Sequence, residues 1–281
     1  MSAPICNRHI RLLRTPTYID IAPASRLYIE ASCAALEDLG DIPIDFLRPV
    51  FGERTREVHV DDFEFSGPLK KLEHRLSNAR VRATGPRRTY RLDSAMQERA
   101  CASNLGPHFG HQLMGSFEEF KSGLARAATG MLGEENPIRD GFNVFTVRGD
   151  DGVSWMFSDY LNLDDQLAWL HDFLRERIHI DPPIFVAAAF MGLFLTAHPF
   201  RDGNGRTSRL LFNVVLREAF RHRDIPYIPL KNFMDLSRHG FEIRLHQAQV
   251  LGRWSPLVRW CCDAIGMMSH WKQSGHGPNS W

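Results

Sequence analysis

The chain has 281 residues, of which 43% are hydrophobic and 24% are charged, and its formal net charge is +1 at pH 7. This is the composition of a soluble globular protein that can bury one large core or two modest ones. The balanced charge excludes an overall electrostatic attraction to nucleic acid or to a membrane surface, although charge can still be concentrated locally.

The cysteines and the start of the chain indicate a reducing compartment. Five cysteines are scattered without the spacing of a zinc site, and the adjacent pair Cys261 and Cys262 is poorly placed to form a disulfide. The first residues lack an apolar run long enough for a signal peptide, and the apolar run at 184–197 is too short to span a bilayer. We expect buried thiols in a cytoplasmic protein that does not enter a membrane. A bacterial protein delivered into a host cell by a non-classical secretion route would have the same features.

Residues 1–90 are expected to form an N-terminal extension with both helical and extended segments. Residues 25–39 are predicted to be a helix capped by Ser25, and residues 58–65 alternate in part and indicate a strand. The apolar residues of that helix near helical spacing are Leu27, Ile29, Cys33 and Leu36. No chemistry is visible in this extension, so packing or target recognition is its expected role.

The segment from Arg75 to Arg91 is rich in arginine and has no acidic residue. Such a run could bind nucleic acid or an acidic partner surface. A solvated linker around Gly85 and Pro86 is the favoured interpretation, because the run contains no recognised binding motif. The segment also marks the expected boundary between the extension and the following domain.

The rest of the chain is predicted to be mainly α. The apolar run at 184–197 is interrupted only by Thr196, so it should be a helix buried on every face, with Asp181 as its cap. The other expected helices cover Leu92–Ser103, Ser116–Leu132, Leu163–Arg177, Arg206–Phe220, Phe241–Val250 and Pro256–Met268.

Residues 141–157 change this pattern. Apolar and β-branched residues precede and follow the polar turn at residues 149–152, as a β-hairpin requires. We therefore expect a small hairpin between the predicted helices. A purely structural role for it remains an alternative.

The connection between the helices at 184–197 and 206–220 has the features of an anion site. Gly203, Asn204 and Gly205 allow positive φ and bring backbone N–H groups close to a ligand at a helix start, whose dipole favours negative charge. Arg206 and Arg209 lie three residues apart on one helix face, where two guanidinium groups can clamp outer phosphates of a nucleotide.

Two further side chains in this connection supply chemistry. Asp202 is a hard carboxylate beside the expected phosphates, which suits Mg²⁺. His198 can be neutral at working pH and accept a proton from an attacking hydroxyl. Phe200 is expected to anchor the connection to the core.

The segment HPFRDGNGRTSR resembles the Fic-domain signature, His-x-Phe-x-Asp/Glu-Gly-Asn-Gly-Arg-x-x-Arg. It matches every fixed position, at His198, Phe200, Asp202, Gly203, Asn204, Gly205, Arg206 and Arg209. The resemblance implies a Fic-type helical bundle with a small β-hairpin flap. Its catalytic core would cover residues 91–270, after the N-terminal extension, and residues 271–281 would be a flexible tail.

The same resemblance implies the transfer of AMP from ATP to a Ser, Thr or Tyr hydroxyl of a target protein. His198 would be the general base and Asp202 would hold Mg²⁺. Asn204 and the amides of Gly203 and Gly205 would hold the α-phosphate region. Arg206 and Arg209 would hold the β- and γ-phosphates.

Two further contacts follow from the resemblance. The flap would align an extended target segment by main-chain hydrogen bonds, with Val144, Phe145 and Thr146 as candidates that the sequence does not distinguish. The nucleotide base would lie near the helix that contains Phe241.

One feature of many Fic proteins is not evident in the sequence. It is an inhibitory helix with the pattern Ser/Thr-x-x-x-Glu-Gly/Asn, whose Glu pairs with the second signature arginine. The nearest segment, Thr89–Ser94, has an aspartate at position 93 and a misplaced Ser94. We therefore expect an uninhibited enzyme, a separate antitoxin-like protein that supplies the acid, or a different form of regulation.

Other functions remain as alternatives. Within the family they are transfer of UMP, phosphocholine or phosphate, or removal of AMP, and the intact glycine loop favours nucleotide transfer. The chain could instead bind nucleic acid or a partner through the arginine run at 75–91, with an idle Fic fold. It could also be a metal-assisted phosphoester hydrolase that uses His198 and Asp202. The sequence does not identify the target, the acceptor residue or the oligomeric state.

Overall fold

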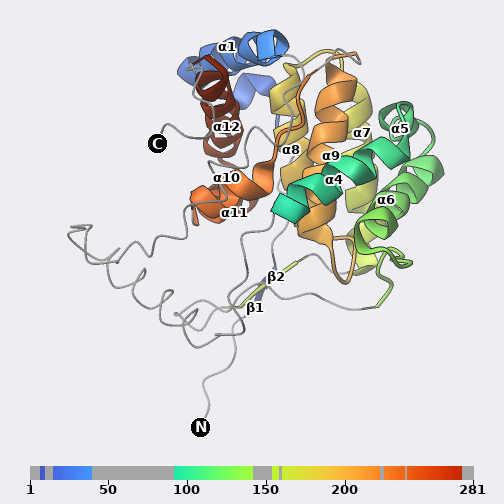
Figure 1. Cartoon of the computed structure of the whole chain (residues 1–281). Coiled ribbons are helices and arrows are strands. Elements are labelled where there is room, and N and C mark those ends of the chain that lie inside the picture. Colours follow the sequence, from blue (N-terminus) through green and yellow to red (C-terminus); the bar gives the residue numbers. More distant parts are fainter. Residues whose placement is uncertain are drawn as a thin grey trace, which may run out of the picture.

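The computed structural model describes residues 7–9, 15–39, 92–141, 154–157, 160–221, 225–237 and 239–273. The fold is mainly α (Figure 1). Its α-helices are α1 (Pro23–Leu39), α4 (Leu92–Leu105), α5 (Phe109–Gln112), α6 (Phe117–Leu132), α7 (Leu163–Arg177), α8 (Pro183–Ala197), α9 (Asn204–Ala219), α10 (Leu230–Leu236), α11 (Gly240–Leu251) and α12 (Ser255–Gln273). The short elements are the 3₁₀ turns η1 (Tyr18–Asp20) and η4 (Tyr160–Asn162) and the strands β1 (Asn7–His9) and β2 (Ser154–Met156).

Helix α8 is the centre of the fold. Every residue from Ile184 to Ala197 is buried, as the uniformly apolar sequence predicts. Helices α1, α7, α9, α11 and α12 all pack against it. The predicted cap is wrong: Pro182 occupies the N-cap position, and the Asp181 carboxylate lies 3.9 Å from Nη1 of Arg177 instead.

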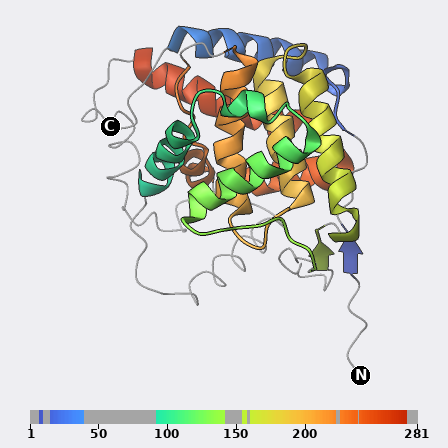
Figure 2. The same cartoon turned by 90° about the vertical axis from the view of Figure 1, so that its right-hand side faces the viewer.

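Helix α9 packs along α8 and joins it to a second group of helices. Its apolar side chains Leu210, Leu211 and Phe212 are fully buried. Helices α4, α5 and α6 contact α9, and Figure 2 shows them in front of the α8–α9 pair. Helix α6 begins with a capping box in which Ser116 and Glu119 bind each other's backbone N–H groups.

Helix α1 packs on α12 and joins the same core. Ile29 and Leu36 of α1 are fully buried, and the hydroxyl of Tyr28 donates to Asp263 on α12 at 2.9 Å. The predicted apolar face is wrong at Leu27, which is 69% exposed because it points away from α12 and α8. Part of the predicted N-terminal extension is therefore built into the helical bundle.

The prediction of buried thiols is confirmed for the described cysteines of α4 and α12. Cys101, Cys261 and Cys262 are buried free thiols, and Cys33 is half-buried. Burial raises the pKa of Cys262 to about 12, so this thiol stays protonated at neutral pH. Among the helices that the structure describes, none has both the length and the apolar character needed to cross a membrane.

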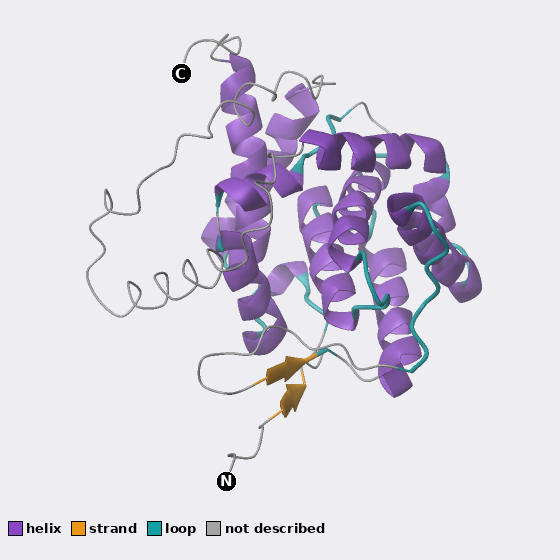
Figure 3. Ribbon diagram, turned by 60° about the horizontal axis from the view of Figure 1, so that its bottom comes forward, coloured by secondary structure: helices purple, strands orange, loops and turns teal. Residues whose placement is uncertain are grey.

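The predicted hairpin at residues 141–157 stays a prediction. Residues 142–153 lie outside the described residues, and β2 pairs in parallel with β1, Arg8 opposite Trp155 (Figure 3). The predicted strand at 58–65 and the arginine run at 75–91 also lie outside the described residues. The predicted start of the tail at residue 271 is too early, because α12 continues to Gln273.

Candidate active site

The signature loop joins the end of α8 to the start of α9 in a few residues. His198 ends α8 in the left-handed region, at φ 50° and ψ 58°, which is uncommon for a residue with a side chain. Gly203 begins α9 with φ 79° and ψ 0°, a conformation that glycine adopts without steric cost. These two left-handed residues turn the chain sharply at both ends of the loop.

The side chain of Asn204 closes the loop from inside. Its Oδ1 accepts a hydrogen bond from the Phe200 N–H at 3.0 Å, and its Nδ2 donates to the Phe200 carbonyl at 2.7 Å. Phe200 itself is fully buried, so its predicted role as an anchor is confirmed. The Asn204 side chain therefore holds the loop backbone in this structure, while its predicted contact with phosphate stays a prediction.

A second clamp comes from the segment after α6. The Arg139 guanidinium donates from Nε to the His198 carbonyl at 2.8 Å and from Nη2 to the Ala197 carbonyl at 3.2 Å. The Arg139 N–H donates to the Pro199 carbonyl at 2.8 Å, and Asn136 donates to the Asp202 carbonyl at 3.1 Å. Arg139 is only 3% exposed, so a buried cation binds the carbonyl end of α8, where the helix dipole favours it.

The His198 imidazole is mostly enclosed. Its Nδ1 is buried, which leaves Nε2 as the ring nitrogen for proton exchange. Burial lowers the pKa of His198 to about 4, with a further lowering by the Arg139 charge and an opposing effect of the Leu195 carbonyl. The imidazole is therefore neutral at pH 7, as the predicted general base requires.

Asp202 and Arg206 face each other at the open side of the loop. Oδ2 of Asp202 lies 3.2 Å from Nη2 of Arg206, and its Oδ1 accepts a hydrogen bond from the Gly203 N–H at 2.6 Å. The Asp202 side chain is 80% exposed, so it is accessible to a ligand. No group of three or more His, Cys, Asp or Glu residues that could hold a metal occurs among the described residues.

This donor set fits Mg²⁺ bound together with a nucleotide. One accessible carboxylate is too little to retain Mg²⁺ alone, but this ion usually keeps several waters and takes phosphate oxygens as well. Asp202 could therefore hold a metal that arrives with a triphosphate.

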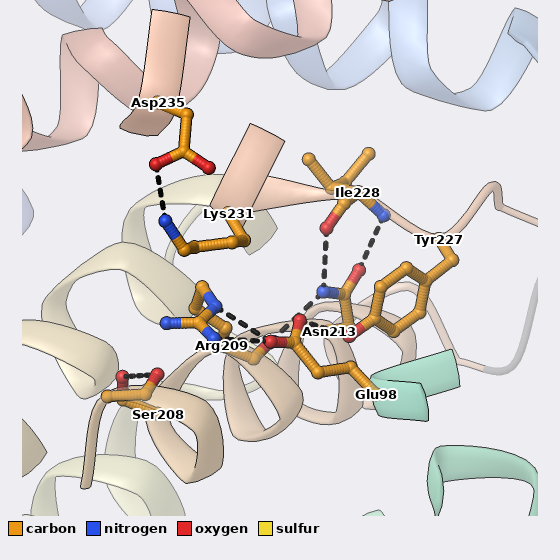
Figure 4. A network of polar contacts seen from close by, with 9 residues as sticks. Glu98, Ser208, Arg209, Asn213, Tyr227, Ile228, Lys231 and Asp235 are labelled. Atoms are coloured by element: carbon orange, nitrogen blue, oxygen red, sulfur yellow. Dashed lines mark hydrogen bonds and ion pairs between the residues drawn. The ribbon is translucent and has the colours of Figure 1, made fainter. Parts of the chain in front are cut away.

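Arg209, the second arginine of the signature, is paired with Glu98 of α4 (Figure 4). Oε1 of Glu98 lies 2.6 Å from Nη2 of Arg209 and accepts a second hydrogen bond from its Nε at 2.8 Å. The Tyr227 hydroxyl donates to Oε2 of Glu98 at 3.2 Å. Burial and the nearby Glu98 carboxylate raise the pKa of Tyr227 well above its usual value, so the hydroxyl keeps its proton as a donor.

The Glu98–Arg209 pair was not expected, because the sequence showed no clear acid of the chain's own that would pair with the second signature arginine. Glu98 is fully buried, and its carboxylate occupies the guanidinium that the resemblance assigns to phosphate. The signal was present as Ser94-x-x-x-Glu98, but Arg99 stands where the pattern has Gly or Asn. The segment Thr89–Ser94, named above as the nearest to the pattern, ends four residues before Glu98.

Of the remaining predicted site residues the structure describes only Phe241, which packs in the core. Val144, Phe145 and Thr146 lie outside the described residues. Phe241 is 5% exposed at the start of α11, where its ring packs against Trp260 with centroids 5.0 Å apart. A cavity of about 290 Å³ lies between α4, α5 and the second half of α9, and none of its lining residues belongs to the signature loop.

The family assignment follows from this loop and the sequence around it. Residues 111–216, which include α6, α7, α8, most of α9 and the whole signature, match the sequence model of the Fic/DOC family. The chain carries a Fic domain. Its fold is also similar to that of Fic-1 from Caenorhabditis elegans, with a TM-score of 0.50, 20% sequence identity, and coverage of 89% of this chain and 72% of that one. A variant of the same protein gives a TM-score of 0.53 at 19% identity.

Curated relatives of the Fic domain include transferases. The protein adenylyltransferase fic-1 of C. elegans is 37% identical over 99 residues, and that of Caenorhabditis briggsae is 36% identical over 99 residues. Each match covers 35% of this chain and 17% of the relative. The family and these relatives support a Fic-type transferase.

Proposed function

We propose that this Fic domain transfers AMP from Mg²⁺-bound ATP to a Ser, Thr or Tyr hydroxyl of a target protein and releases pyrophosphate. The observation that carries the proposal is the meeting of α8 and α9 around one loop. That loop brings together a neutral histidine, an accessible carboxylate and two arginines. The similarity to adenylyltransferases named fic-1 supports AMP as the transferred group.

The start of α9 would bind the phosphates. The N–H groups of Asn204, Gly205 and Arg206 belong to the first helical turn, which offers them no intrahelical acceptor. Together with the helix dipole they favour an anion at this end. Arg206 and Arg209 would bind the β- and γ-phosphates once their carboxylate partners are displaced.

Asp202 would hold Mg²⁺ with the phosphates. When bound, the ion neutralises phosphate charge and holds the triphosphate in one orientation. In this structure Asp202 instead neutralises Arg206. Binding of the nucleotide would therefore separate this ion pair, so that Asp202 could hold the metal and Arg206 could bind phosphate.

His198 would act as the general base. Its Nε2 takes the proton of the target hydroxyl while the hydroxyl oxygen forms a bond to the α-phosphorus. The bond from that phosphorus to the oxygen bridging to the β-phosphate breaks, and pyrophosphate leaves. Because the reaction depends on alignment, the clamp by Arg139 and the closure by Asn204 contribute to the rate by fixing the loop.

Glu98 would hold the enzyme in an inhibited resting state. Its carboxylate occupies Arg209, so a γ-phosphate must displace Glu98 before it can bind there. Release of Glu98 requires its side chain, or α4 as a whole, to move away from Arg209, and target binding could cause this movement. This inhibition within the chain is an alternative to the expected antitoxin-like partner, and the target, like the flap contact, remains a prediction.

The proposal is tested with purified protein and a cell lysate. Separate reactions contain ATP, GTP, UTP or CTP labelled at the α-phosphate, and each is run with the parent protein, with Glu98→Ala and with Glu98→Ala/His198→Ala. We expect label from ATP on specific proteins in the Glu98→Ala reaction. The further loss of His198 should reduce that labelling by about 10² to 10⁴, the usual contribution of a general base. Equal labelling by both variants contradicts the role of His198, and label from another nucleotide alone contradicts AMP transfer.

A further inference from the structure

Phe157 lies directly on the imidazole of His198. The two ring centroids are 3.8 Å apart and the ring planes are inclined by 11°, which is face-to-face contact. Phe157 directly follows β2, whereas His198 ends α8, so different parts of the fold bring the two rings together. No motif in the sequence marks Phe157 for this contact.

We propose that Phe157 is a positioning residue for His198, which closes one face of the imidazole to water and fixes the plane of the ring. This inference rests on the proposed function for its meaning in catalysis, but the contact can be tested without any activity. A ring covered on one face, with Nδ1 buried, presents its Nε2 edge for proton transfer. The target hydroxyl must therefore approach in the imidazole plane.

Three observations favour positioning over general core packing. Phe157 is only half-buried, so its ring covers the histidine at the border between protein and solvent. His198 is held in a left-handed conformation by backbone contacts, and the Leu195 carbonyl also acts on its ring. The stacked ring adds a restraint on one face, because tilting of the imidazole would press it against a second flat ring at this distance.

The charged side chains around His198 lie at different places around the signature loop. The guanidinium of Arg139 acts on the imidazole from the segment after α6, and it donates to the main-chain carbonyl of His198 rather than to its ring. Asp202 and Arg206 pair with each other at the other end of the loop. We expect removal of the Phe157 ring to leave these charged groups in place. A change in the imidazole pKa then reports that one face of the ring has become open to water.

The experiment compares Phe157→Ala and Phe157→Leu with Phe157→Tyr, which keeps an aromatic ring. Nuclear magnetic resonance follows the imidazole signals of His198, assigned by their absence in His198→Gln, through a pH titration. We expect Phe157→Ala to raise the pKa of the imidazole by about one unit or more, because water reaches the open face. Phe157→Leu should raise it less, and Phe157→Tyr should leave it near the parent value.

AMP transfer provides the second readout. In the Glu98→Ala background, Phe157→Ala should lower kcat about tenfold while KM for ATP changes less than about twofold, because the phosphate contacts are untouched. An imidazole pKa unchanged in both Phe157→Ala and Phe157→Leu overturns the proposal, as does a defect confined to KM. If Phe157→Ala does not fold, Phe157→Leu decides by the same criteria. If the parent protein transfers no AMP, the titration still decides whether Phe157 shields His198.

Discussion

Glu98 and Arg209 form a buried ion pair between α4 and α9, although 111 residues separate them in the sequence. Two hydrogen bonds from the guanidinium converge on one carboxylate oxygen, and the Tyr227 hydroxyl binds the other. Removal of one partner of such a buried pair is strongly destabilising, since the remaining charge is left unpaired away from water. The pair therefore ties α4 to α9, and under the proposed function it would hold until a phosphate replaces Glu98 at Arg209.

Glu98→Ala is expected to activate the enzyme and to destabilise it. Without the carboxylate, Arg209 can bind phosphate directly, so labelling from ATP should rise by about tenfold or more. In the absence of nucleotide the unpaired buried arginine should lower the free energy of unfolding by about 3 to 5 kcal/mol. Mg²⁺-bound ATP should restore part of that loss, which thermal unfolding with and without nucleotide would measure.

Two matched variants separate this effect from general damage to α4. Gln97→Ala changes the exposed neighbour of Glu98 and should leave both labelling and stability near the parent values. Tyr227→Phe removes only the hydrogen bond to Oε2 and should give a smaller activation than Glu98→Ala. Activation by Gln97→Ala equal to that by Glu98→Ala would remove the case for a specific pair.

The signature loop could be predicted from sequence because its function depends on local geometry. Glycine at 203, a buried Phe200 and closely spaced arginines all act within one turn or one helix start, so their order in the chain determines their place. Some helix boundaries were predictable for the same reason, as α7 shows by beginning and ending at the expected residues, whereas α12 continues past the expected Met268 to Gln273.

The supporting contacts could not be predicted, because they join segments that are distant in sequence. Arg139 reaches the end of α8 across 59 residues, and Phe157 meets His198 from a different element. Nothing in the residues around Arg139 distinguishes it from a solvated arginine. Glu98 had a partial signal in Ser94-x-x-x-Glu98, but Arg99 breaks the expected pattern.

Arg139 is expected to be a major contributor to the stability of the site. Arg139→Met keeps much of the volume but leaves the carbonyls of Ala197 and His198 without their donors. Two buried acceptors without partners should cost about 2 to 4 kcal/mol in the free energy of unfolding. Denaturant titration followed by tryptophan fluorescence measures this loss.

Arg139→Lys provides the control for charge. A lysine keeps the positive charge at the end of α8 but cannot reach two carbonyls in the forked geometry of a guanidinium. It should therefore recover only part of the stability, and AMP transfer should remain impaired. Full recovery by lysine would mean that the charge alone matters and that the paired hydrogen bonds do not.

The two glycines of the loop should respond to alanine in opposite directions. Gly203 has φ 79°, and an added Cβ would lie 3.2 Å from a side-chain carbon of Leu132. Gly203→Ala should therefore destabilise the protein by about 1 to 2 kcal/mol and disturb the loop. Gly205 lies inside the first turn of α9, where an added Cβ would meet only Nη1 of Arg209 at 3.6 Å.

Gly205→Ala is therefore the matched control for Gly203→Ala. Alanine favours helix over glycine, so the free energy of unfolding should rise by up to about 1 kcal/mol. Any loss of AMP transfer in this variant would then report a crowded approach of phosphate to the backbone, separate from folding. Destabilisation by Gly205→Ala as large as that by Gly203→Ala would contradict the left-handed role of Gly203.

The low pKa of His198 should make the stability of the protein depend on pH. The imidazole has a pKa of about 4 in the folded protein and about 6.5 in the unfolded chain, so the unfolded chain binds more protons between these values. Stability is therefore fully present above pH 6.5 and falls as the pH drops toward 4. Between pH 7 and pH 5 this one group should account for about 2 kcal/mol.

His198→Gln isolates that contribution, because every other titrating group remains. Denaturant titrations of the parent and the variant at pH 7, 6 and 5 should show a steeper loss of stability for the parent. The difference between the two proteins should change by about 2 kcal/mol over this range, in favour of the variant at low pH. A difference that stays constant with pH would mean that His198 is not held neutral by burial, and the argument for an enclosed base would fail with it.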